Sequence, residues 1–194
     1  MRKSSTSPRD RVFVAYGRNE LARVALFEFL RALGLDPVEW SAAVVRGGPN
    51  PRVERTVRRE IAGARAIVVL FTGDDMARLR SEFVGAGESD SESLPRPQPR
   101  ANVIYEAGLA EGIAPRRTII VQVGRPKPFS DFAGRYVVRM DDKIASRQQL
   151  KHQLQATGCR IRATGTDWHT AGNFDLASTG GVSGDAAMEH YNVY

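Results

Sequence analysis

Short apolar runs alternate with segments of helical periodicity along most of this chain. The clearest run is residues 66–71, Ala-Ile-Val-Val-Leu-Phe, and others occupy 12–16, 37–40, 118–123 and 136–139. Unbroken apolar runs of this length are typical of strands that are buried on both faces. Their alternation with helical segments predicts an α/β fold, in which helices cover both faces of a parallel sheet.

The helical segments are expected at 20–33, 51–64, 101–111 and 146–157. A shorter helix is expected to run through Leu79, because Thr72-Gly73-Asp74-Asp75 fits a capping box. In that motif Thr72 accepts a hydrogen bond from a backbone N–H and Asp75 reaches back. Residues 85–99 are rich in Gly, Ser, Pro and acidic residues, which predicts a long surface loop.

The composition excludes several classes of protein. Hydrophobic residues make up 42% and charged residues 26% of the chain, as is typical of soluble globular proteins. No apolar stretch approaches the roughly 20 residues that span a bilayer, and the N-terminus lacks the apolar core of a signal peptide. We therefore expect a cytoplasmic protein without a membrane partner. The single cysteine, Cys159, and histidines without metal-ligand spacing predict neither a disulfide nor a metal site.

The charge is unevenly distributed. The net charge is +6, but residues 163–194 contain four acidic side chains and no Lys or Arg. The basic remainder could attract nucleic acid or phosphorylated small molecules, although a solvated arginine-rich surface is the simpler interpretation. No aromatic residues are interspersed among the arginines, which argues against nucleic acid as a partner.

We expect a disordered N-terminus over 1–10, one domain over 11–160, and a Gly/Ala/Ser-rich acidic tail or linker over 161–194. The tail either leads to a further domain or docks on the body through Trp168 and Phe174. Ligands of parallel sheets bind beyond the carboxyl ends of the strands. The segments that follow predicted strands there are 17–19, 41–51 and 72–75.

Residues 100–108, Arg-Ala-Asn-Val-Ile-Tyr-Glu-Ala-Gly, are the most informative segment for function. On a helical wheel Glu106 lies at the edge of the apolar arc that includes Val103, with Asn102 one turn earlier on the same side. A carboxylate there would be partly desolvated, which disfavours its ionised form and is frequent at functional sites. The alternative is a rim glutamate that pairs with Arg100 or a neighbouring helix.

Gly17-Arg18-Asn19 is either a tight turn with a helix cap or a phosphate site built from Arg18 and helix N–H groups. A Walker A motif is absent from the sequence, which excludes NTP hydrolysis by that route. No Ser-His-Asp or Cys-His catalytic arrangement can be assembled.

Three segments, 12–19, 68–75 and 100–108, occur in an order that resembles the bacterial TIR-like, predicted nucleotide-binding domain family. Its members include TIR effectors of cyclic-nucleotide anti-phage systems, and the resemblance covers roughly residues 11–158. It implies a flavodoxin-like TIR fold with a five-stranded parallel sheet. Tyr16 stands where the family often has histidine, and Gly73 where it often has proline.

The resemblance also implies an activity. TIR enzymes hydrolyse NAD to nicotinamide and ADP-ribose or a cyclised form, so NAD is a substrate and no cofactor is expected. Their catalytic glutamate corresponds to Glu106, and their BB-loop, which helps to form the site and mediates assembly, corresponds to 41–51. The expected substrate-binding residues are Tyr16, Gly17, Arg18, Thr72, Asp74, Asn102 and Tyr105.

TIR NADases are usually activated by self-association, after a sensor domain or partner detects a signal such as a cyclic nucleotide. The resemblance therefore implies low activity of this chain in dilute solution. Three other functions stay open: a non-catalytic TIR assembly module, a nucleotide sensor that binds without turnover, and a nucleoside deoxyribosyltransferase-like enzyme that exchanges bases on deoxynucleosides.

Overall fold

The computed structural model describes residues 10–38, 53–85, 93–127, 134–162 and 165–178. Five parallel strands form one sheet in the order β2-β1-β3-β6-β7. The strands are β1 (Arg11–Ala15), β2 (Asp36–Val38), β3 (Ala66–Phe71), β6 (Thr118–Val123) and β7 (Val137–Met140). The predicted five-stranded parallel sheet is therefore confirmed. β3 and β6 have the predicted bounds, β1 and β7 are shifted by one residue, and residues 39–40 of the predicted second strand lie outside the described residues.

The strands form where the sequence supplies apolar side chains for both faces. Every residue of β3 is buried. Along β1, Val12 and Val14 belong to the apolar core on one face of the sheet, whereas Phe13 and Ala15 belong to the core on the other face. Successive side chains of a strand point to opposite faces, so this alternation requires cover on both sides.

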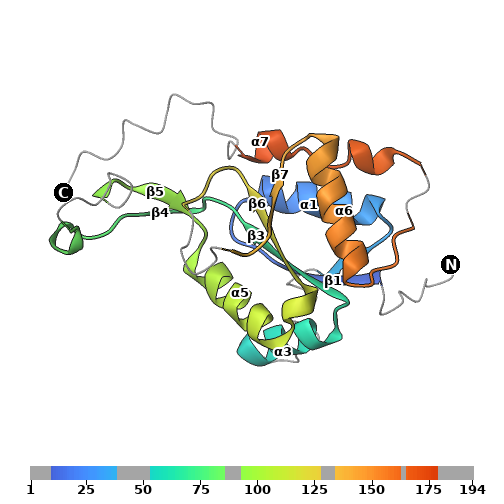
Figure 1. Cartoon of the computed structure of the whole chain (residues 1–194), viewed down its shortest axis with the longest axis horizontal. Helices are drawn as coiled ribbons and strands as arrows, with labels where there is room; N and C mark the ends of the chain where they lie inside the picture. The colour runs from blue at the N-terminus through green and yellow to red at the C-terminus, as the bar shows by residue number, and fades with distance from the viewer. Residues whose placement is uncertain (1–9, 39–52, 86–92, 128–133, 163–164, 179–194) are drawn as a thin grey trace.

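Helices supply that cover (Figure 1). α1 (Glu20–Ala32), α6 (Ile144–Ala156) and the short α7 (Phe174–Ser178) pack on one face, and α3 (Val53–Gly63) and α5 (Ala101–Ile113) on the other. The prediction of helices on both faces is confirmed. No helix within the described residues is long and apolar enough to cross a membrane.

The strand order has a switch point at β1. The chain leaves β1 through α1 to reach β2 on one side, and all later strands of the sheet lie on the other side, beginning with β3. Connections that diverge in this way leave a crevice beyond the carboxyl ends of the strands, where ligands of such folds bind.

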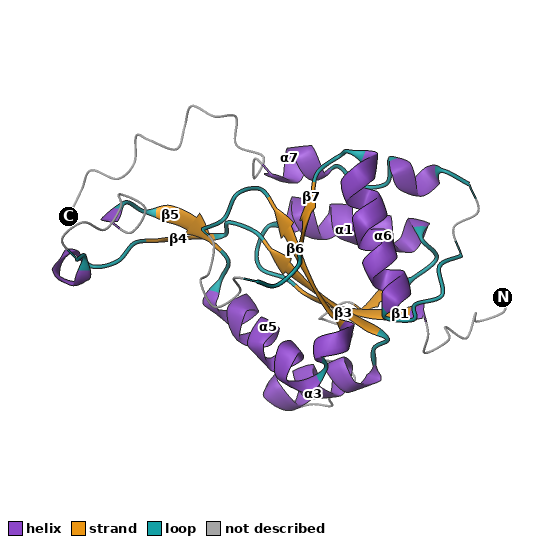
Figure 2. Ribbon diagram, viewed as in Figure 1, coloured by secondary structure: helices purple, strands orange, loops and turns teal. Residues whose placement is uncertain are grey.

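Residues 72–79 do not form the predicted helix. Instead β4 (Asp75–Ala77) pairs antiparallel with β5 (Arg96–Gln98), with Met76 opposite Pro97. Figure 2 shows this two-stranded arm extending away from the main sheet. The capping pattern was misleading because pairing with a segment distant in sequence outweighed a local preference. For the same reason 85–99 is not one uninterrupted loop.

The segment 165–178 packs on the body. Trp168 and Phe174, only 5% and 0% exposed, belong to the same core as α1 and α6. Arg147 of α6 is 1% exposed, and its Nη2 donates to Asp142 Oδ1 (2.8 Å) and to the carbonyl of Gly172 (2.7 Å). The sequence leaves two alternatives open for the tail, a linker to a further domain and docking on the body. Residues 165–178 dock on the body through Trp168 and Phe174, as the second alternative predicts.

Candidate functional site

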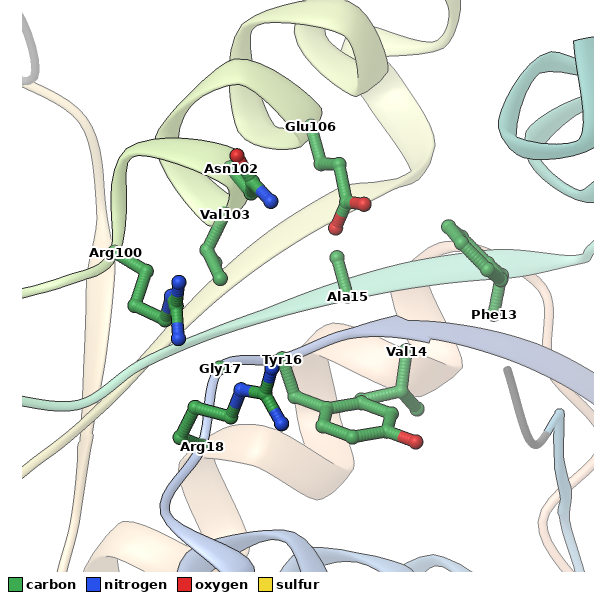
Figure 3. Close-up of a pocket in the computed structure, with 10 residues that line it drawn as sticks. All are labelled: Phe13, Val14, Ala15, Tyr16, Gly17, Arg18, Arg100, Asn102, Val103 and Glu106. Carbon is green, nitrogen blue, oxygen red and sulfur yellow. The ribbon is translucent and has the colours of Figure 1, made fainter. Parts of the chain in front are cut away.

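A pocket of about 440 Å³ lies at the carboxyl end of β1, where the switch point predicts a ligand site. Its volume is within the range of roughly 300–1,000 Å³ that is usual for small-molecule sites. Figure 3 shows the lining residues, which are Phe13, Val14, Ala15, Tyr16, Gly17, Arg18, Arg100, Asn102, Val103 and Glu106. The pocket thus lies between β1, the turn that follows it and the first two turns of α5.

The turn after β1 is held in place by Asp74, which lies in the segment that follows β3. The backbone N–H of Arg18 donates to Asp74 Oδ2 at 2.5 Å. A Cβ at position 17 would overlap that same carboxylate, so a larger residue there would require the Asp74 side chain to move away from the turn. Asn19 then caps α1, because its Oδ1 accepts from the N–H of Ala22 at 3.0 Å.

α5 presents two polar side chains to the pocket. Its apolar residues Val103, Ala107 and Ala110 are buried against the sheet, which fixes the rotation of the helix. Asn102 and Glu106, which are four residues apart, consequently lie one above the other on the side that faces β1. The helical-wheel prediction for these two residues is confirmed.

Glu106 is half-buried, and its carboxylate points from α5 into the pocket toward β1 (Figure 3). Desolvation raises the pKa of this carboxyl from 4.5 to about 7. No residue in the described part of the chain donates a hydrogen bond to it or forms an ion pair with it. The carboxylate is therefore left available for a ligand, and it differs from a rim glutamate held in a salt bridge.

Two guanidinium groups line the same pocket. Arg18 comes from the turn after β1, and Arg100 precedes the first residue of α5. The nearest carboxylate to Arg100 is that of Asp75, with 4.0 Å between Nε and Oδ1, and not that of Glu106. In the view of Figure 3 both arginines lie at the opposite end of the pocket from Phe13. One end of the pocket is thus cationic, whereas the end that contains Phe13 is apolar.

The structure brings together some of the residues that the sequence singled out and separates others. Those that line the pocket are Tyr16, Gly17, Arg18, Asn102 and Glu106. The remaining three do not: Thr72 is 1% exposed within the body, Asp74 supports the turn from behind, and Tyr105 is 60% exposed on α5. The segment 41–51 lies outside the described residues.

Arg100 is the polar lining residue that the sequence interpretation missed as a ligand contact. It was considered only as an ion-pair partner for Glu106. Its place immediately before a helix that starts at the carboxyl edge of a parallel sheet was the available signal, since helix N-termini at that edge face ligands.

A comparison with protein families finds a match over residues 11–142 to the family described as CAP12/Pycsar effector protein, TIR domain. A search of curated proteins finds no match. The matched region contains all five strands of the sheet and every residue that lines the pocket. The chain belongs to the CAP12/Pycsar effector TIR-domain family, whose members are bacterial effectors of cyclic-nucleotide anti-phage defence.

Proposed function

We propose that this TIR domain is a NAD glycohydrolase and that Glu106 is its catalytic residue. The observation that carries the proposal is a half-buried carboxylate, without a partner among the described residues, that faces a pocket also lined by two arginines. NAD has the matching charges, because its nicotinamide-ribose end is cationic and its diphosphate is anionic. NAD is then the substrate, and no cofactor takes part.

The chemistry needs one carboxylate. Nicotinamide leaves with the electron pair of the bond to the ribose C1′ and becomes neutral, so no acid has to protonate it. Water forms the new bond to C1′ and releases one proton to solvent, which gives ADP-ribose. The ribose passes through an oxocarbenium-like transition state, and a carboxylate beside it stabilises that positive charge. Glu106 has this role in its ionised form.

The other lining residues bind the remaining parts of the substrate. Arg18 and Arg100 hold the diphosphate, since guanidinium groups bind phosphate oxygens through paired, charge-assisted hydrogen bonds. Asn102, one turn before Glu106, reaches the ribose hydroxyls. Ala15 and Val103 give the apolar wall that excludes water from the reacting carbon. Thr72, Asp74 and Tyr105 lie outside the lining, and of these Asp74 acts through the turn that carries Arg18.

Activation follows from the family. The chain belongs to effectors of cyclic-nucleotide signalling, so we propose that a cyclic nucleotide, detected by a sensor domain or partner, drives self-association of the TIR domain. Turnover by the isolated chain is then low in dilute solution and rises with protein concentration.

The test is release of nicotinamide from NAD, followed by chromatography, at low and high protein concentrations. Wild type is compared with Glu106→Gln and with Glu28→Gln, which makes the same change at an exposed position of α1. Concentration-dependent release that is lost only in Glu106→Gln supports the proposal. Full activity of Glu106→Gln contradicts the role of this residue.

Three other outcomes would replace the proposal. Self-association without NAD loss at any concentration indicates an assembly module, and tight nucleotide binding without turnover indicates a sensor. Base exchange on deoxynucleosides, with NAD unchanged, indicates a deoxyribosyltransferase-like enzyme. Chromatography of the adenine-containing product distinguishes linear from cyclised ADP-ribose.

A further inference from the structure

A second pocket, of about 820 Å³, opens at the carboxyl ends of β6 and β7. It shares no lining residue with the pocket that contains Glu106. Its lining residues are Arg96, Gln122, Gly124, Arg125, Pro126, Arg139, Met140, Asp141, Asp175 and Ser178. The wall therefore combines the arm, the ends of two sheet strands and α7.

Three arginines from three different segments meet around this pocket. Arg96 belongs to β5, Arg125 follows β6, and Arg139 belongs to β7. The arm is held beside the end of β6 by a hydrogen bond of 2.6 Å from the N–H of Lys127 to the carbonyl of Pro97. The arginines are thus gathered by the fold and not by proximity in sequence.

None of the three arginines forms an ion pair with a residue in the described ranges. Like charges that share one pocket repel one another, and an anion placed between them removes that repulsion. On a surface without an anion ligand, we would expect each guanidinium to form an ion pair with a neighbouring carboxylate. The unpaired cluster instead has the electrostatic character of an anion site.

The two acidic residues of the lining already have partners. Asp141 Oδ1 accepts hydrogen bonds from Ser146 Oγ at 2.6 Å and from the N–H of Lys143 at 3.0 Å. Asp175 Oδ1 accepts from the N–H of Asp142 at 3.2 Å. Both carboxylates keep their negative charge, so the lining holds three guanidinium groups and two carboxylates. The carboxylates are engaged at the starts of α6 and α7 and form no ion pair with the arginines within the described residues.

We propose that this second pocket binds a small phosphate-bearing ligand through Arg96, Arg125 and Arg139. Guanidinium groups are suited to phosphate because their planar forks donate two parallel hydrogen bonds to its oxygens. A hollow of this volume accepts a nucleotide-sized molecule. This proposal does not depend on NAD cleavage, since the two pockets have separate linings.

The experiment measures binding of inorganic pyrophosphate by isothermal titration calorimetry at low ionic strength. Four proteins are compared: wild type, Arg125→Gln/Arg139→Gln, Arg18→Gln/Arg100→Gln, and Arg78→Gln/Arg116→Gln. The last is the matched control, because it removes the same charge from two exposed arginines that line neither pocket. Near-UV circular dichroism of each protein checks that its fold is retained.

We expect pyrophosphate to bind the Arg18→Gln/Arg100→Gln protein, where only the second pocket is intact, and the control. Loss of two charge-assisted contacts weakens binding at the second pocket by about ten-fold or more in Arg125→Gln/Arg139→Gln. Hydrogen–deuterium exchange then shows ligand-dependent protection of residues 122–125 in the wild type and not in that variant.

Three results would overturn the proposal. One is the absence of pyrophosphate binding to Arg18→Gln/Arg100→Gln, and another is an equal weakening in the Arg78→Gln/Arg116→Gln control. The third is equal protection of residues 122–125 by pyrophosphate in the wild type and in Arg125→Gln/Arg139→Gln, which would show that these arginines do not hold the ligand.

Discussion

The carboxylate of Asp74 fills the space that a side chain at Gly17 would need, and the same carboxylate accepts the N–H of Arg18. The segment after β3 therefore fixes the turn after β1, which carries one side of the pocket. This relationship assigns Asp74 a supporting role, in which it positions pocket residues without lining the pocket.

Gly17→Ala is expected to destabilise the domain by about 1–3 kcal/mol, because its Cβ displaces the Asp74 carboxylate and breaks the hydrogen bond from the N–H of Arg18. The matched control is Gly108→Ala in α5, where a Cβ meets nothing within 4 Å. Alanine there raises helix propensity and is expected to stabilise by about 0.5–1 kcal/mol. Urea unfolding measures the free energy of unfolding of both variants. A Gly17→Ala protein that is as stable as Gly108→Ala would contradict the assigned contact.

Glu106→Gln is expected to stabilise the protein at pH 8 but not at pH 4. The folded-state pKa of Glu106 is raised to about 7 from 4.5, so stability from its protonated form is complete below 4.5 and is lost as pH rises through about 7. After allowance for partial exposure, the difference is about 1–2 kcal/mol. Urea unfolding between pH 4 and 8 checks it, with Glu28→Gln as control.

The charged groups that face Glu106 across the pocket are Arg18 and Arg100. A stability difference between wild type and Glu106→Gln that stays constant from pH 4 to 8 would show that Glu106 has the same pKa in the folded and unfolded states, so that these arginines offset its desolvation. That result would contradict a carboxylate governed by desolvation.

Arg100→Gln is expected to raise KM for NAD about ten-fold or more while kcat changes little, because the diphosphate is held equally in the ground state and the transition state. The assay is nicotinamide release at the protein concentration that gives activity in the wild type. Arg116→Gln, an exposed change outside the pocket, is the control. A fall in kcat at unchanged KM would place Arg100 nearer the reacting carbon.

Arg147→Ala is expected to cost about 2–4 kcal/mol of unfolding free energy, because it removes the buried guanidinium that donates to Asp142 and to the carbonyl of Gly172. It also removes the contact with Phe174, whose ring centre lies 5.1 Å from the guanidinium carbon. Loosening of 165–178 should expose Trp168 and shift its fluorescence to longer wavelength. Arg78→Ala, at an exposed position, should stay within about 0.5 kcal/mol of the wild type.

The sheet could be predicted from the sequence because its strands are buried on both faces, so that runs such as 66–71 are apolar without interruption. The direction of Glu106 could be predicted for a similar reason. The apolar residues of α5 determine which side of the helix meets the sheet, and the position of every other side chain follows.

The arm and the support of the turn could not be predicted, because both depend on contacts between distant segments. The residues Thr72–Asp75 alone predict a helix cap. In the structure this segment leads into β4, which pairs with β5, about twenty residues later in the sequence. Gly73, where the family resemblance leads one to expect proline, has a structural reason of the same kind. A Cβ at that position would lie 2.6 Å from Pro97 Cβ, so glycine allows the close approach of the arm.

Asn19 connects the far end of the described chain to the wall of the pocket. Its Oδ1 caps α1, while its Nδ2 donates to the carbonyl of Ala177 in α7 at 3.0 Å. Arg18 is its immediate neighbour in the pocket lining. The turn that carries Arg18 is therefore joined to the C-terminal end of the described chain by this hydrogen bond as well as by the apolar packing of Phe174 on α1.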